Sequence, residues 1–304
     1  MPLQLYELPT MTDPLQLFQS QRRRLFSIAY RMLGVRADAE DVLQDVYLRW
    51  QNADIDQLDS AEAWLVTVTT RLAIDRLRAA KAERAAYVGT WLPEPMIEEE
   101  SAQSPEDLVE RADDIAYALL VVLERLGPEE RAAFLLKQVF DHDYPDIARI
   151  LGKSEAGCRQ LVHRAKQRVQ REQPRFSVTP QTHREQLRRF IEAAQSGDYH
   201  KIMALLSPDV QNAGDGGGKM PSTFHPLYGA ERVARLYYAI ARRNGPHLSY
   251  RFAQINGELG LLRYYDGKLE SALSFVTGED GIAAIYTVRN PDKLKHIAAA
   301  QAVI

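Results

Sequence analysis

The sequence predicts a multidomain protein in which two all-α domains precede an α+β domain. Apolar residues recur at helical spacing through about the first 170 residues, and Gly, Pro and acidic residues interrupt this pattern at 87–104. After residue 248 the pattern changes to short runs of β-formers separated by turn residues. A chain of 304 residues exceeds the usual size of one domain, so two or three domains are expected, each large enough for its own core.

A first helical domain is predicted for residues 11–86. Residues 15–33 have helical spacing, and a second helix at 38–50 carries acidic residues near its N-terminus, where the helix dipole favours them. Ser60 caps a third, long helix that is apolar at its start and basic at its end. Its β-branched run, residues 66–70, is poor helix material, so tertiary packing is expected to hold it.

The segment 87–104 has the composition of a linker. It contains Gly and Pro residues and opens an acidic stretch from Glu94 to Asp114, which we expect to be solvated or to repel DNA. A second helical domain is predicted for residues 105–173, with its first two helices at 105–126 and 129–140.

The second helical domain contains a predicted helix-turn-helix at residues 144–171. Apolar residues form one face of its first helix, Gly152 ends that helix and Ser154 caps the next. From Lys153 to Arg171, six Lys and Arg residues accompany a single acid, Glu155. A helix of this charge suits the anionic groove of DNA, although a solvated amphipathic helix would show the same pattern in isolation.

The C-terminal domain, predicted at residues 179–304, has α+β character. Helices are expected at about 180–206, 229–243 and 291–302, and strands at 248–256, 259–265, 269–277 and 282–288. Turn residues at Asn256-Gly257, Asp266-Gly267 and 279–281 join the strands into an antiparallel meander. We expect a curved sheet wrapped on helices.

Composition narrows the function classes. The net charge of -3 conceals Arg-rich stretches at 22–24, 71–84 and 159–171, which suggest surfaces that face DNA. The single cysteine, Cys158, excludes an intrachain disulfide and is expected to pack between helices as a small hydrophobe rather than to act as a redox switch. No apolar run approaches the roughly 20 residues of a membrane span, and the N-terminus lacks the features of a signal peptide, so a cytoplasmic protein is expected.

Three motifs resemble, in order and spacing, those of the extracytoplasmic-function (ECF) sigma factors of bacterial RNA polymerase. They are DAEDVLQDVYLRW at 38–50, AWLVTVTTRLAIDRLR at 63–78 and YPDIARILGKSEAGCRQLVHRA at 144–165. Three more, WLPEP at 91–95, DGGGK at 215–219 and NPDKL at 290–294, resemble marks of the subgroup with a fused SnoaL-like C-terminal domain. The resemblance implies sigma region 2, sigma region 4 and a SnoaL-like cone in that order, and a factor that directs core polymerase to specific promoters.

Sigma region 2 of such a factor would bind polymerase and the -10 promoter element. The resemblance implies that Asp41, Gln44 and Asp45 meet the clamp coiled coil of the polymerase largest subunit, where acids complement a basic surface. The loop at 51–60 would capture a flipped base, and the following helix would assist melting. The residues implied at the -10 element are Asn52, Asp54, Trp64, Arg71, Asp75, Arg76 and Arg78. Many family members have Asn at the position of Arg71, and a Trp on an apolar helix face is more often a core residue, so these two contacts are left open.

Sigma region 4 would read the -35 element and contact the beta flap of polymerase. Arg159, Gln160 and His163 match the base-reading positions; Arg can be bidentate to guanine and Gln to adenine. His163 could equally be a surface histidine. Arg164, Lys166 and Arg168 would lie on phosphates.

The C-terminal cone is not expected to be catalytic. SnoaL-like cones enclose a pocket, and their enzymatic members use an Asp or His acid/base, for which Asp209, Asp215, His225 and His247 are candidates. Nothing in the sequence pairs them, and no cofactor or metal is expected, while a small-molecule ligand of the cone stays open. The tri-glycine segment lacks the spacing of a Walker phosphate loop and is expected to be a mobile contact loop.

The cone is expected to regulate the sigma regions in cis, so that no separate anti-sigma factor is required. The motifs lie in predicted loops and turns, which suits a contact between domains. The residues expected at this contact are Trp91, Pro93, Pro95, Asp215, Gly216, Gly217, Gly218, Lys219, Asn290, Pro291, Asp292, Lys293 and Leu294. Core RNA polymerase and promoter DNA are the expected partners, with no membrane.

Two other classes of protein stay open at this point. One is a ligand-responsive regulator with a helix-turn-helix, and the other is a cyclase or isomerase with appended DNA-binding modules. A simple regulator has no need for an acidic clamp helix, a base-capture loop and a basic melting helix, so the N-terminal domain favours the sigma factor.

Overall fold

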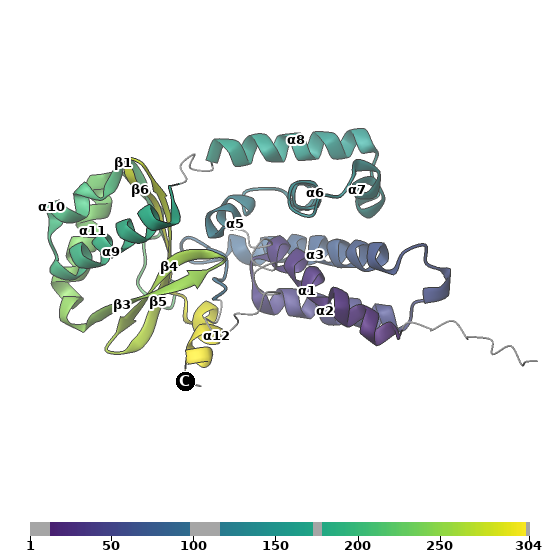
Figure 1. Cartoon of the computed structure of the whole chain (residues 1–304), viewed down its shortest axis with the longest axis horizontal. Helices are drawn as coiled ribbons and strands as arrows, with labels where there is room; N and C mark the ends of the chain where they lie inside the picture. Colours follow the sequence, from purple (N-terminus) through teal and green to yellow (C-terminus); the bar gives the residue numbers. More distant parts are fainter. Residues whose placement is uncertain (1–12, 98–115, 173–177, 302–304) are drawn as a thin grey trace, which may run out of the picture.

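The computed structural model describes residues 13–97, 116–172 and 178–301 and places two sets of helices beside a curved sheet domain (Figure 1). This confirms the predicted fold class of two all-helical parts followed by an α+β part. No helix in the described ranges is both long and apolar enough to cross a bilayer.

The first helical set consists of α1 (Pro14–Leu33), α2 (Arg36–Gln51) and α3 (Ala61–Ala85), with a short 3-10 turn at Ile55–Gln57 before α3. Ser60 accepts a hydrogen bond from Ala63 N at 3.2 Å and so caps α3, as its sequence predicts. Within the β-branched run of α3, Thr67 and Thr69 donate to the carbonyls of Ala63 and Leu65. Those hydroxyls are satisfied locally, and the helix can bury this poor helix-forming segment.

The second helical set consists of α5 (Tyr117–Leu123), α6 (Pro128–Gln138), α7 (Tyr144–Leu151) and α8 (Glu155–Glu172). Gly152 ends α7 in a left-handed conformation with φ of 64°. This confirms the predicted helix-turn-helix, and α8 lies along α6 and α7 at the edge of the molecule (Figure 1). Of the predicted helix at 105–126, the part before residue 116 lies outside the described residues.

The two helical sets share one core, whereas the sequence suggests a core for each domain. A continuous cluster of buried residues runs from Leu25 and Trp50 through Leu120 and Phe134 to Cys158. Each set leaves an apolar face uncovered by its own helices, and the two faces cover each other. Buried Cys158 confirms the expected role of that residue as a small hydrophobe between helices.

The C-terminal part, here called the cone, is a six-stranded sheet in the order β2-β1-β6-β5-β4-β3 with four helices. Its elements are α9 (Pro180–Ser196), α10 (Tyr199–Ala204), β1 (Leu206–Asp215), β2 (Leu227–Tyr228), α11 (Ala230–Asn244), a 3-10 turn (Gly245–His247), β3 (Leu248–Ile255), β4 (Glu258–Tyr265), β5 (Lys268–Gly278), β6 (Gly281–Val288) and α12 (Pro291–Gln301). The predicted meander is confirmed by β3 to β6. Strand β1, which pairs parallel with β6, was not predicted because LSPDVQNAGD contains few β-formers.

The two faces of the sheet carry separate apolar clusters. One cluster packs the sheet against α9 and α11, with Phe190 and Tyr237 in edge-to-face contact at 4.9 Å between ring centroids. The other cluster includes Leu294 of α12 and also Leu92 and Tyr117, which come from the helical side of the chain. The cone and the helical sets are therefore joined by buried apolar surface.

The expectation of a solvated acidic stretch is wrong at its first residue, Glu94. Leu92 is 1% exposed and Glu94 is 7% exposed, because the WLPEP segment runs between the first helical set and the cone. Ile97 adds an isolated antiparallel bridge to Ile255 at the edge of β3. The rest of the acidic stretch, residues 98–114, lies outside the described residues.

Candidate functional site at the junction of the helical sets and the cone

Asp215 is the centre of the contact between the WLPEP, DGGGK and NPDKL segments, which we call the junction. Its carboxylate is fully buried at the end of β1. Oδ2 accepts from Leu92 N at 3.0 Å and from Lys293 Nζ at 2.7 Å, while Oδ1 accepts from Tyr87 OH at 2.6 Å and from Gly217 N at 3.0 Å. Four donors from three separate segments thus converge on one side chain.

Lys293 completes the charge of this cluster. Its ammonium also donates to the carbonyl of Leu92, so it contacts both the carboxylate and the linker backbone. Burial lowers the pKa of Lys293, and the neighbouring Asp215 carboxylate opposes this shift. The pKa of the Tyr87 phenol is raised, first by burial and then by its hydrogen bond to Asp215.

Trp91 contacts two cations from different parts of the chain. The guanidinium of Arg84, near the end of α3, is 3.8 Å from a Trp91 ring centroid, and Lys293 Nζ is 4.0 Å from one. Each cation–π contact contributes about 0.5–2 kcal/mol, depending on its desolvation. The indole therefore joins α3 of the first helical set to α12 of the cone.

The glycines of DGGGK permit close approach. Gly217 has φ of 61°, and a Cβ at this position would lie 2.4 Å from Asn290 Nδ2. Gly218, with φ of 70°, lies against the side chain of Val88. A side chain at either position would separate the loop from its partner, so the tri-glycine is fitted to a contact rather than to a phosphate.

A second contact lies on the β3–β4 turn. Asn256 and Gly257 both have positive φ, as the predicted tight hairpin requires. The Asn256 side chain accepts from Met96 N at 3.0 Å and donates to Tyr30 OH at 2.9 Å. Tyr30 in turn donates to the carbonyl of Glu94 at 2.6 Å, so α1, the linker and the cone are tied by one chain of hydrogen bonds. Burial raises the pKa of Tyr30 and keeps the phenol a donor.

The sequence did not predict the contact between Tyr30 and Asn256, nor that Lys293 lies against the Trp91 ring. The Asn-Gly pair is a turn signal wherever it occurs, and its use as a contact becomes visible only when the hairpin is placed against α1. Glu94 has a further partner, since Nδ1 of His296 in α12 lies 3.0 Å from Glu94 Oε1. A histidine on a solvent-exposed face of α12 would give the same sequence pattern, so the sequence does not predict this contact.

The residues expected at the -10 element are largely engaged within the protein. Arg71 donates from Nε to the carbonyl of Ile150 at 2.8 Å and from a second nitrogen to that of Arg149 at 3.0 Å, so α3 contacts the turn of the helix-turn-helix. Arg76 pairs with Asp38 at 2.6 Å. Arg78 pairs with Asp75 of its own helix at 3.1 Å and with Glu129 of α6 at 2.9 Å.

The other -10 residues differ in exposure. Asn52 and Asp54 are exposed on the loop between α2 and α3. Asn52 donates to the carbonyl of Leu48, and Asp54 accepts from the side chain of Gln57. Trp64 is partly buried against the Trp50 ring at 5.5 Å between centroids. The indole of Trp64 thus belongs at least in part to the core.

The residues expected at the -35 element form an exposed basic face of α8. Arg159, Gln160, His163 and Lys166 line a hollow together with Tyr144, and Arg159 lies 4.8 Å from the Tyr144 ring centroid. The opposite face of α8 is buried. Three members of this set have acidic partners. Arg164 and Arg168 pair with Glu130 of α6 at 3.1 and 3.2 Å, and Arg159 pairs with Glu155 of its own helix at 3.0 Å.

The acidic face of α2 is exposed. Asp41, Gln44 and Asp45 all point to solvent, and neither carboxylate has an ion-pair partner among the described residues. Leu48, one helical turn further, is also exposed, at 57%.

The four candidates for an acid/base in the cone are not brought together. Asp215 is saturated by the junction, His247 pairs with Asp266 at 2.7 Å on the surface, and Asp209 accepts from Ser207 at 3.1 Å. His225 is exposed on the segment that follows the DGGGK loop. Within the described ranges, no group of three His, Cys, Asp or Glu side chains could hold a metal ion.

Comparisons with known proteins identify the helical sets. A model of sigma-70 region 2 matches residues 17–83, and a model of sigma-70 region 4 matches residues 117–169. The ECF RNA polymerase sigma factor SigJ of Mycobacterium tuberculosis strain H37Rv is 39% identical over 286 residues, which cover 91% of each chain. This chain belongs to the ECF sigma factors. A probable ECF sigma factor of the same organism, SigI, is 35% identical over 195 residues, 64% of this chain and 67% of the relative.

The relationship extends to the structure of the whole sigma factor. The crystal structure of M. tuberculosis SigJ aligns with a TM-score of 0.76 and 35% identity, covering 92% of this chain and 98% of SigJ. The sheet domain is consistent with a SnoaL-like cone. Sigma regions 2 and 4 imply RNA polymerase and promoter DNA as partners, and these matches give no support to a ligand-responsive repressor or to an appended cyclase.

Proposed function

We propose that the cone of this sigma factor holds regions 2 and 4 in a closed arrangement and thereby regulates promoter use in cis, without a separate anti-sigma factor. The observation that carries the proposal is the Asp215 cluster, in which four donors from the linker and the cone converge on one buried carboxylate. A buried ion pair is costly to separate, since each partner would be left without compensation. The junction therefore suits a two-state latch.

The packing of region 2 against region 4 supports the closed arrangement. Arg71 and Arg78 of α3, both expected at the -10 element, bond to α7 and α6 of region 4. Promoter engagement by both regions would require these contacts to be exchanged for DNA. We propose that the domain limits are 11–86, 105–173 and 179–304, with 87–104 as the linker through which the cone acts.

We further propose that the exposed faces carry the contacts with partners. Asp41, Gln44 and Asp45 would bind the clamp coiled coil of polymerase, where a free acidic face favours a basic partner. Region 4 would bind the beta flap and, through α8, the -35 element. Arg159 and Lys166 have no acidic partner on α6, unlike Arg164 and Arg168, and would contact DNA first. The protein would act in the cytoplasm with polymerase, and the cone would not be catalytic.

Run-off transcription with core polymerase tests the regulation. Lys293→Met weakens the junction, and Asn256→Ala weakens the second contact at the β3–β4 turn. Each should raise transcript yield several-fold at equal factor concentration. Lys201→Ala is the control, because Lys201 is exposed on α10. Equal or lower yield from both variants, with polymerase binding unchanged, would exclude regulation through these two contacts.

A further inference from the structure

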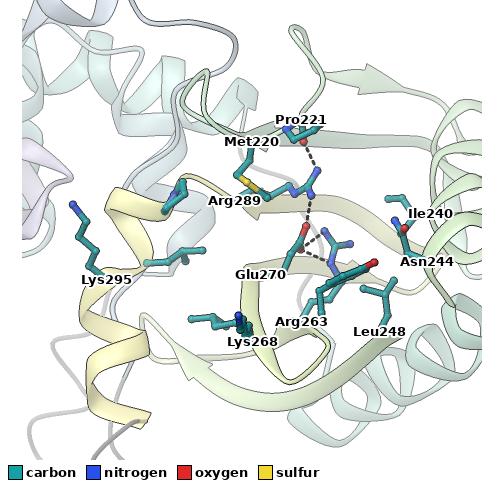
Figure 2. A pocket seen from close by; sticks show the side chains of 14 residues that line it. Met220, Pro221, Ile240, Asn244, Leu248, Arg263, Lys268, Glu270, Arg289 and Lys295 are labelled. Atoms are coloured by element: carbon teal, nitrogen blue, oxygen red, sulfur yellow. Dashed lines mark hydrogen bonds and ion pairs between the residues drawn. The ribbon is translucent and has the colours of Figure 1, made fainter. Parts of the chain in front are cut away.

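The cone contains a cavity of about 570 Å³ between α11, α12 and the ends of β4 and β5 (Figure 2). This volume falls within the roughly 300–1,000 Å³ of small-molecule sites. The cavity is distinct from the Asp215 cluster, although Pro291 and Leu294 of NPDKL line it and Met220 and Pro221 follow directly after DGGGK.

The floor of the cavity carries more positive than negative charge. Glu270 lies between two guanidinium groups, pairing with Arg263 at 2.8 Å and also with Arg289 (Figure 2). Arg263 is 3% exposed and Glu270 is 12% exposed at the side chain, so one unit of positive charge is left over in a largely buried triad. Although burial alone would raise the pKa of Glu270, the two arginines lower it, and the carboxylate stays ionised.

The rim adds to this excess. Lys268 and Lys295 line the cavity, and only Lys295 has an acidic partner among the described residues, Asp292 at 2.8 Å. Glu270 is the single acid in the lining. Arg289 also has hydrogen-bonding capacity to spare, because its Nε is buried without a hydrogen-bond partner in the described part of the chain. A guanidinium with an unsatisfied N–H, in a triad that holds one excess positive charge, favours an incoming anion.

The remaining wall is apolar. Met220, Ile240, Leu248, Leu269 and Leu294 contribute most of it. Such a wall would reject a bare inorganic anion, which keeps its hydration in water, but it would favour burial of the apolar body of an amphipathic anion. A carboxylate matches a guanidinium in a planar, two-pronged contact.

We propose that this cavity binds a small amphipathic carboxylate, with its head group on Arg289 and Arg263 and its apolar body against Ile240, Leu248 and Leu269. The binding site itself does not depend on regulation by the cone. If the junction is a latch, as proposed above, the ligand lies where it can bias that latch, because Arg289 also donates to Pro221 O beside the DGGGK loop. The backbone N–H of Arg289 donates to the carbonyl oxygen of Asp215 at 2.7 Å.

Titration calorimetry on the full chain tests the site with matched probes. Decanoate should bind, while 1-decanol, which has the same chain without the charge, and acetate, which has the charge without the chain, should each bind at least about tenfold more weakly, a difference of about 1.4 kcal/mol. All probes are kept below micelle-forming concentrations. An aromatic acid such as 2-naphthoate tests whether the cavity prefers a flat or an extended apolar body. Binding of either decanoate or 2-naphthoate that is stronger than the binding of 1-decanol supports the carboxylate site.

Variants locate the head group. Arg289→Gln should weaken decanoate binding at least about tenfold and leave 1-decanol unchanged. Arg235→Gln is the control, because Arg235 is an exposed arginine on α11 that pairs with Glu231 outside the cavity. Equal affinity of the wild-type protein for decanoate and 1-decanol, or no binding of either acid, would overturn the proposal even if Arg289→Gln failed to fold. Undiminished decanoate binding by a folded Arg289→Gln would overturn it as well.

Discussion

Lys293 Nζ lies 2.7 Å from Asp215 Oδ2 in the junction, where Asp215 is fully buried and the Lys293 side chain is 9% exposed. The pair joins the NPDKL and DGGGK segments within the cone, and both partners also bond to the backbone of Leu92 in the linker. Tyr87 of the linker also donates to Asp215, so any opening that withdraws the linker leaves this pair short of three hydrogen bonds. Lys293 and Asp215 therefore couple the cone to the linker.

The first prediction concerns this pair. Asp215→Asn and Lys293→Met should each lower the free energy of unfolding by about 3–5 kcal/mol, because each leaves an uncompensated buried charge. The double variant should lose less than the sum, with a coupling of at least about 1 kcal/mol. Urea denaturation of the four proteins provides the measurement. The exposed pair Lys219–Asp292 is the control, and its removal should cost no more than about 1 kcal/mol. Additive losses at Asp215 and Lys293 would contradict the pairing.

The second prediction concerns Gly217. Gly217→Ala should destabilise the protein by more than Gly267→Ala, by about 1 kcal/mol or more in urea denaturation. Both glycines have positive φ, 61° and 76°, so each substitution carries the same backbone strain of about 1 kcal/mol. A Cβ at Gly267 meets no atom within 4 Å, whereas one at Gly217 collides with Asn290. Equal losses would mean that the loop does not press against NPDKL in solution.

The third prediction concerns the contact between regions 2 and 4. Arg71→Ala should lower the free energy of unfolding by about 1–2 kcal/mol, because two carbonyls at the turn of the helix-turn-helix lose a charged donor. Amide hydrogen exchange across residues 149–158 should quicken in the same variant. Lys81→Ala, an exposed change on the same helix, should leave the free energy of unfolding within about 0.5 kcal/mol of the wild type and the exchange rates of residues 149–158 unchanged. Unchanged exchange in Arg71→Ala would show that this contact is not made in the free protein.

Particular residues show how far sequence alone could predict this molecule. Alternating β-formers and Asn-Gly or Asp-Gly turns predict strands β3 to β6, and Gly152 and Ser154 predict the helix-turn-helix. Strand β1 contains Pro208, Asp209 and Asn212, and it is a strand because β6 and β2 pair with it on both sides. Local composition carries no record of such long-range pairing.

The junction was predicted only as a set of segments. Their sequences contain charged residues typical of solvent-exposed loops, and nothing local states that Asp215 and Lys293 are buried. The shared core of regions 2 and 4 was missed for the same reason, since an amphipathic helix shows which face is apolar but not which partner covers it.

The fourth prediction concerns Cys158. Its thiol is fully buried between α7 and α8, and burial raises its pKa, so at neutral pH the reactive thiolate is scarce. Alkylation by iodoacetamide should be slow in the folded protein and should accelerate by orders of magnitude in denaturing urea, with the rate below the transition following the unfolded population. Rapid modification without loss of structure, followed by mass spectrometry and circular dichroism, would contradict the packing.

The last prediction uses Tyr237, whose phenol is buried in the cone and donates to Asn212 Oδ1 at 3.1 Å. Burial raises the pKa of Tyr237 to about 12, while an unfolded tyrosine ionises near pH 10. Between these two values the unfolded chain holds fewer protons than the folded chain, so the free energy of unfolding should fall as pH rises from about 10 to 12, at up to about 1.4 kcal/mol per pH unit for this one group. Other buried tyrosines contribute in the same direction, so the test is the difference between the wild type and Tyr237→Phe. The variant should show a shallower fall over this window, offset at neutral pH by about 1 kcal/mol for the lost hydrogen bond. Parallel pH profiles for the two proteins would mean that Tyr237 ionises at its ordinary pKa and that the cone is open to water at this point.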